Sequence, residues 1–129
     1  MPEEALAYRE SAVDLLELYA SPERQREYQR NVPGSDVPSE LVCMWFDDFW
    51  NFTEGPPSSE HADAWNASVA RFRQCFSESE IAALAKFHEF YAAREAALPM
   101  GDLEHLLVTP AWREVMIEAR SALAAFGPT

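Results

Sequence analysis

Residues 39–52 are the most apolar segment of the chain, and they constrain the fold more than any other feature. On a helix, their large apolar side chains leave only a narrow polar strip, which holds Glu40, Asp47, Asp48 and Asn51. Read alone, residues 41–46 also match a buried strand, because they form a continuous apolar run. No β-branched run elsewhere in the sequence would pair with such a strand. We therefore expect a helix that is buried on most sides, either in the chain's own core or against a partner.

Helical periodicity and capping patterns mark the rest of the chain. Apolar residues recur at helical spacing in residues 3–20 and 60–75. The N-cap patterns Ser21-Pro22, Ser77-Glu-Ser-Glu80 and Thr109-Pro110 open three further helices, which are expected to end near Asn31, Leu98 and Gly127. A short helical turn is expected at residues 102–107. Residues 33–38 and 53–59 are expected to be loops, because proline and glycine cluster there.

Composition also favours helices over strands. The 129 residues include 20 alanines and only 4 glycines, which argues against a turn-rich all-β fold. Domains commonly hold about 100–150 residues, and the sequence contains no repeat or linker. We expect an all-α fold, with one domain over residues 1–129 built as an irregular bundle of five or six helices.

The chain is strongly acidic, with a formal net charge of −12 at pH 7. Residues 1–63 have a balance of −10 and residues 64–129 a balance of −2, so the acidic field belongs mainly to the first half. Nucleic acid and anionic membrane surfaces repel a polyanion, and we expect neither as a partner.

Residues 22–31 carry a local cluster of arginines at positions 24, 26 and 30. These arginines do not form one continuous helical face, and neighbouring glutamates neutralise part of their charge. We expect a short exposed helix that is polar nearly all round, held by pairs such as Glu23–Arg26 and Glu27–Arg30.

The sequence predicts a cytoplasmic protein. Its first residues lack the basic start and apolar stretch of a secretory signal, and no window reaches 18 apolar residues, so no membrane span is expected. Cys43 and Cys75 match no metal or redox spacing, and their apolar neighbours predict that both are buried, reduced thiols. The richness in alanine and arginine beside a single lysine, Lys86, suggests a GC-rich, bacterial genome.

No motif for catalysis, metal binding or cofactor binding is present in the sequence. His61, His88 and His105 each have a carboxylate nearby, but neither paired Glu-x-x-His nor His-Glu-x-x-His occurs. His88 is expected to be half-buried with a hydrogen-bond partner. Nucleophile elbows and glycine-rich phosphate loops are also absent from the sequence. We expect no metal and no cofactor, and these observations favour a non-catalytic protein over an enzyme.

The segment from Trp45 to Trp50 holds the candidate binding residues, which are Trp45, Asp47, Asp48 and Trp50. Aromatic side chains anchor interfaces, and carboxylates beside them select a basic partner. One alternative places Trp45, Phe49 and Phe52 in the core while the aspartates face water. Another is an aromatic pocket for an organic cation, held by cation–π contact.

Charge, size and motifs together predict a small acidic protein-binding module that docks onto a basic partner protein, in the manner of an antagonist or immunity protein. This interpretation expects several of Asp47, Asp48, Trp50 and the acidic residues of the first helix to share one exposed patch. The alternative is a helical bundle with an aromatic pocket for a small ligand, built from residues 45–50 and 65–76. An exposed apolar helix would also suit a homodimer.

Overall fold

The computed structural model describes residues 3–50 and 62–127, and this part of the chain is all-α, as predicted. It contains seven α-helices, slightly more than the five or six expected, and no strand. The α-helices are α1 (Glu3–Ala20), α2 (Pro22–Asn31), α3 (Val37–Cys43), α4 (Ala62–Gln74), α5 (Glu78–Arg94), α6 (Leu103–Leu107) and α7 (Pro110–Leu123). A π-helical segment, η1 (Met44–Phe49), continues α3, and the 3-10 turns η3 (Glu95–Ala97) and η4 (Ala124–Phe126) extend α5 and α7.

Two of the three predicted caps form as expected, whereas Thr109 precedes α7 but its hydroxyl donates to the carbonyl of His105 and makes no cap hydrogen bond. The side chain of Ser21 accepts a hydrogen bond from the backbone N–H of Arg24, and Pro22 occupies the first position of α2. Ser77 and Glu80 form the reciprocal capping box that opens α5. The loop expected at residues 33–38 is shorter than predicted, because Asp36 caps α3 and the helix already begins at Val37. The loop expected at residues 53–59 lies outside the described residues.

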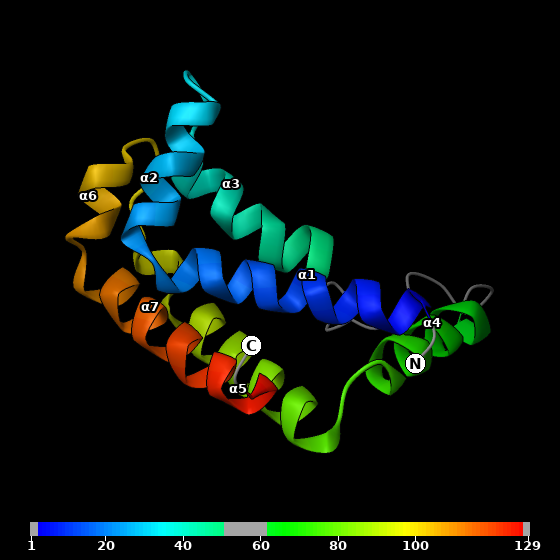
Figure 1. Ribbon diagram of the computed structural model, residues 1–129. Helices are drawn as coiled ribbons and strands as arrows, with labels where there is room; N and C mark the ends of the chain where they lie inside the picture. The colour runs from blue at the N-terminus through cyan, green and yellow to red at the C-terminus, as the bar shows by residue number, and fades with distance from the viewer. Residues whose placement is uncertain (1–2, 51–61, 128–129) are drawn as a thin grey trace.

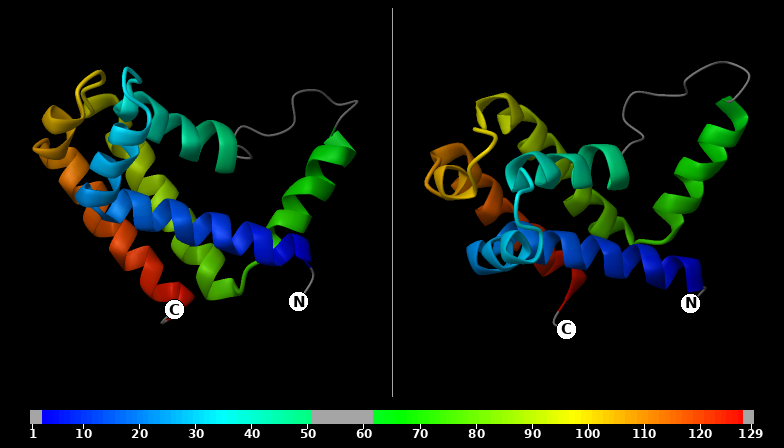
Figure 2. Two further views of the ribbon diagram at one scale, coloured as in Figure 1. Left: turned by 45° about the horizontal axis from the view of Figure 1, so that its top comes forward. Right: turned by 90° about the horizontal axis from the view of Figure 1, so that it is seen from above.

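Helix α7 packs against both α1 and α5, and these three helices form the largest contacts of the fold (Figure 1). Helix α3 with η1 lies on the other side of α1 from α7, and α2 and α6 gather at the end of the molecule where α1 finishes (Figure 1). Helix α4 stands at the opposite end, near the start of α1, in both further views (Figure 2). None of the described helices is both long and apolar enough to cross a membrane.

The core is built largely from aromatic rings around Tyr19 of α1. The Tyr19 ring lies 5.6–6.3 Å, between centroids, from the rings of Trp45, Phe87, Tyr91 and Trp112. Its hydroxyl donates a hydrogen bond to the backbone carbonyl of Leu41 at 2.6 Å, which ties α1 to α3. Edge-to-face contacts of this kind favour one fixed arrangement of the rings, so the core also fixes how α1, α3, α5 and α7 are placed.

Helix α2 is largely exposed, as expected, but one of its polar residues lies in the core. Gln25 is fully buried, and its amide accepts from the indole N–H of Trp112 and donates to the carbonyls of Leu18 and Tyr19. Arg26 pairs through two 3.0 Å hydrogen bonds with Glu104 of α6. Glu23, the partner expected for Arg26 within the helix, acts on it only through a weaker Coulomb interaction. Periodicity within one helix cannot show which neighbouring helix its polar residues meet.

Candidate binding groove

The two tryptophans of the predicted binding segment lie in the core. Trp45 has no exposed surface and Trp50 is 6% exposed. Their indoles are nearly parallel, with an interplanar angle of 7° and centroids 5.9 Å apart. Neither ring stands on an exposed rim, where the docking interpretation had expected aromatic anchors.

The π-helical segment η1 explains why both indoles are buried. The backbone N–H of Trp50 bonds to the carbonyl of Trp45 at 2.7 Å, which is the i to i+5 pattern of a π-helix. In an α-helix, residues five apart point about 140° away from each other, whereas the wider turn brings Trp50 towards the side of Trp45. Sequence reasoning assumed the α-helical period and so missed this placement.

His88 of α5 supports the buried indoles from the side. Its Nδ1 accepts a hydrogen bond from the Trp45 indole N–H at 3.0 Å, and its ring stacks on Trp50 with centroids 5.4 Å apart. His88 is half-buried with a hydrogen-bond partner, as expected. Burial lowers the pKa of His88, although nearby Glu89 acts in the opposite direction. The neutral imidazole is the form that can accept this bond, so the lowered pKa and the geometry agree.

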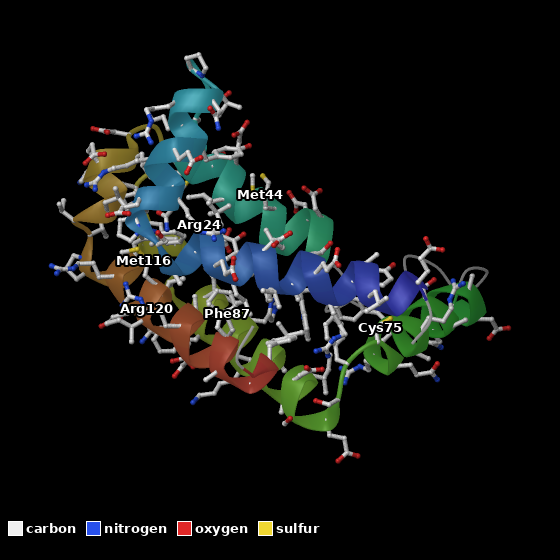
Figure 3. The ribbon with its side chains drawn as sticks, viewed as in Figure 1. Arg24, Met44, Cys75, Phe87, Met116 and Arg120 are labelled. Carbon is white, nitrogen blue, oxygen red and sulfur yellow. The ribbon has the colours of Figure 1, made fainter. Side chains whose placement is uncertain are left out.

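The two predicted aspartates, Asp47 and Asp48, are exposed. Asp48 lines a surface groove of about 430 Å³ between α1 and the α3–η1 segment. Helix α1 supplies Tyr8, Ser11, Asp14, Leu15 and Leu18, and the other side supplies Met44, Asp48 and Phe49. We call these eight residues the acidic groove. Met44, labelled in Figure 3, marks the side formed by α3 and η1.

The acidic groove combines an apolar lining with one carboxylate from each side. Leu15, Leu18 and Met44 are half-buried, so part of their apolar surface remains open to a ligand. Asp14 and Asp48 are both exposed. The groove therefore offers apolar contact and negative charge at the same place.

Few cations counter the charge of the first half of the chain. Three of its four arginines are held by carboxylates: Arg9 by Glu80, Arg24 by Glu17, and Arg26 by Glu104. None of these three arginines lines the acidic groove. The field at the groove is therefore negative.

Sequence reasoning expected acidic residues of the first helix at the site but missed the apolar residues that α1 contributes to the groove, although a signal is present. Ala12, Leu16 and Tyr19 form one apolar stripe, at i, i+4 and i+7, and this stripe is buried in the core. Tyr8, Leu15 and Leu18 form a second stripe beside it. The apolar surface of α1 is therefore wider than the part that packs into the core, and the second stripe remains open to contact a ligand.

Cys43 corrects one prediction, because it is exposed rather than buried. A hydrogen bond from its thiol to Asp47, helped by partial burial and neighbouring carboxylates, raises the pKa of Cys43. Cys75 is buried, as expected, and its thiol donates a hydrogen bond to the backbone carbonyl of Arg71 at 3.2 Å. The raised pKa leaves Cys43 mostly protonated near neutral pH and so a weak nucleophile.

The histidines do not form a metal site in the described residues. His88 faces the indoles and His105 is exposed on α6, while His61 lies outside the described residues. In residues 3–50 and 62–127, no three His, Cys, Asp or Glu side chains come together as metal ligands.

Comparison with known proteins adds no assignment. No protein-family model matches the chain, and neither curated proteins nor solved structures give a significant match.

Proposed function

We propose that this protein is a small acidic binding module that engages a basic partner protein through the acidic groove. The observation that carries the proposal is the pairing of an open apolar lining with Asp14 on one side and Asp48 on the other. An apolar side chain of the partner fills the groove, and lysine or arginine side chains beside it meet the two carboxylates. Apolar burial supplies most of the affinity, while the charges select the partner and speed association.

Within this proposal, the predicted binding residues divide into two roles. Asp47 and Asp48 present charge to the partner. Trp45 and Trp50 are positioning residues, since their stacked, buried indoles hold η1 and therefore the side of the groove that carries Asp48. An antagonist or immunity-like protein that masks a cationic protein would use a surface of this kind.

The aromatic-pocket alternative has no comparable support. The rings of residues 45–50 pack on one another and on His88 and Phe72, with centroids 5.0–5.9 Å apart in these contacts. Space between the rings is therefore filled by the protein's own side chains. The acidic groove is open to solvent and suits a partner's surface better than an enclosed small molecule.

The proposal is tested by affinity capture from the native host's lysate at low and at high salt. The wild-type chain is compared with the double variant Asp14→Asn, Asp48→Asn, followed by titration of the captured protein in purified form. Removing two rim charges should weaken binding about tenfold, at roughly 0.5–1 kcal/mol for each ion pair. High salt should reduce wild-type binding by screening the same pairs.

A matched control is the double variant Glu27→Gln, Glu89→Gln, which changes the net charge equally at exposed positions outside the groove. This variant should bind within about twofold of wild type. Equal weakening by both double variants would show a general charge effect and would contradict a groove-specific site. Capture of no basic protein would contradict the proposal for the growth conditions used.

A further inference from the structure

Helix α7 separates its charges onto two faces. Its acidic residues face α5, where Glu114 pairs with Arg94 at 2.7 Å and Glu118 pairs with Lys86 at 3.6 Å. Arg113 and Arg120 belong to a different face, and neither forms an ion pair with the described part of the chain. The glutamates of α7 are thus neutralised by cations of α5, while the guanidinium groups of Arg113 and Arg120 remain available to a partner.

An exposed apolar side chain lies between these arginines. Arg113, Ile117 and Arg120 follow the i, i+4, i+7 spacing that places residues on one side of an α-helix. Ile117 is 60% exposed. The two arginines are separated by about 10.5 Å along the helix axis, at 1.5 Å per residue.

The same face borders a second surface hollow, of about 440 Å³, between α2, α6 and α7. We call it the basic hollow. Its lining includes three arginines and an apolar part: Arg26, Arg113, Arg120, Val108, Met116 and Ile117. Val108 is 69% exposed, the largest exposed fraction among the large apolar side chains that the structure describes. Met116 and Arg120 appear near each other on α7 in Figure 3.

From this arrangement we propose that the basic hollow is a second docking surface, which binds an acidic amphipathic helix of a partner protein. Two carboxylates placed two turns apart on that helix pair with Arg113 and Arg120, and apolar residues between them pack on Ile117 and Val108. Exposed apolar side chains together with unpaired arginines are the composition of a protein interface. A nucleic acid would instead bring an extended polyanion against a chain with a net charge of −12.

The proposal is tested with a fluorescent 14-residue helical peptide that carries glutamates at i and i+7 and leucines at i+3 and i+4. Titration into the full-length chain should saturate with a dissociation constant below about 1 mM. Amide chemical-shift changes should cluster on α6, α7 and the start of α2. The double variant Arg113→Glu, Arg120→Glu should weaken binding by at least about tenfold, because two attractions become repulsions.

The control variant Arg30→Glu, Arg71→Glu introduces the same change in net charge at exposed arginines outside the hollow. It should retain binding within about threefold. A control peptide with lysine in place of both glutamates should not bind at the basic hollow. Circular dichroism of both protein variants establishes that they fold, so a loss of binding reports on the surface.

Three outcomes would overturn the proposal. The first is no saturable binding of the acidic peptide. The second is binding that Arg113→Glu, Arg120→Glu leaves unchanged. The third is a different occupant of the basic hollow. This would be shown by concentration-dependent dimerisation in sedimentation, or by binding to phosphatidylglycerol vesicles in preference to the peptide, if the same double variant abolishes that dimerisation or vesicle binding.

Discussion

Replacing the buried amide of Gln25 should destabilise the fold more than any other substitution in α2. Gln25 is fully buried and makes three hydrogen bonds, one accepted from Trp112 and two donated to backbone carbonyls at the end of α1. These bonds join α1, α2 and α7 at one point. Gln25→Leu keeps a similar side-chain volume and removes all three.

The magnitude follows from the partners that are left behind. At a net value of about 1 kcal/mol for each hydrogen bond, the loss is about 3 kcal/mol. The Trp112 side chain has no exposed surface, so in the variant its indole N–H could not bond to water instead and would stay unsatisfied. The Leu18 carbonyl, in contrast, keeps a 3.4 Å hydrogen bond from the backbone N–H of Ser21. We therefore expect a loss of about 2–4 kcal/mol, a large part of the roughly 5–15 kcal/mol that stabilises a typical domain.

Urea unfolding followed by tryptophan fluorescence and by circular dichroism measures this loss. The midpoint should fall by about 1–2 M, given typical urea slopes for proteins of this size. Gln29→Leu, at an exposed position of the same helix, serves as the control and should change stability by less than about 0.5 kcal/mol. A loss below about 1 kcal/mol for Gln25→Leu would refute the assigned role of the amide.

Three further predictions concern titratable groups. Because burial lowers the pKa of His88, its contribution to the free energy of unfolding should be fully present above about pH 6.5 and should decrease below that pH. Urea unfolding at pH 7.5 and pH 5 should show this loss of stability for wild type and a smaller loss for His88→Gln, whose amide still accepts from Trp45. Equal losses for the two proteins would contradict the assignment. Burial alone would raise the pKa of Glu80, but hydrogen bonds from Arg9 and from the helix cap outweigh burial and lower this pKa. Glu80→Gln should therefore reduce the free energy of unfolding by about 2 kcal/mol at pH 7, and this difference from wild type should shrink below about pH 4.3. A difference that does not change with pH would argue against the ion pair. Cys43 should react with iodoacetamide at pH 7.5 more slowly than free cysteine, since its pKa is raised; a rate equal to that of free cysteine would show that the carboxylate contact is absent in solution.

Local sequence signals predicted the helices well because capping and periodicity are properties of neighbouring residues. The capping box at Ser77 and Glu80 opens α5 where expected, and Ser21 caps α2. Gly127 lies just after η4, near the predicted end of the last helix, and adopts a positive φ of 75°, which glycine tolerates readily.

Tertiary contacts decided the features that the sequence did not predict. Gln25 reads as one more polar residue in a polar helix, and only the approach of Trp112 makes it a core residue. Trp50 reads as a residue on a different face from Trp45, and only the π-helical turn brings the two indoles together. A pattern that assumes a fixed helical period can predict neither the contact between Trp112 and Gln25 nor the π-helical turn before Trp50.

The candidate groove was predicted in part. Asp48 was identified from its aromatic neighbours, and the acidic first helix was expected to share its surface. Met44 and the apolar residues Leu15 and Leu18 were not identified as site residues, because the packing of α1 against α3 and η1 brings them to one groove. The separation between buried and open apolar stripes on α1 also depends on that packing.

The most direct test of the central claim places a photoreactive benzoylphenylalanine at position 44, in the acidic groove, and irradiates the protein in cells of its native host. The account predicts an adduct with a basic protein, reduced when Asp14→Asn and Asp48→Asn are introduced together. The same probe at position 82, exposed on α5 and outside the groove, serves as the control and should give no such adduct. No adduct from position 44, or the same adduct from both positions, would contradict the claim that this groove is where a basic partner binds.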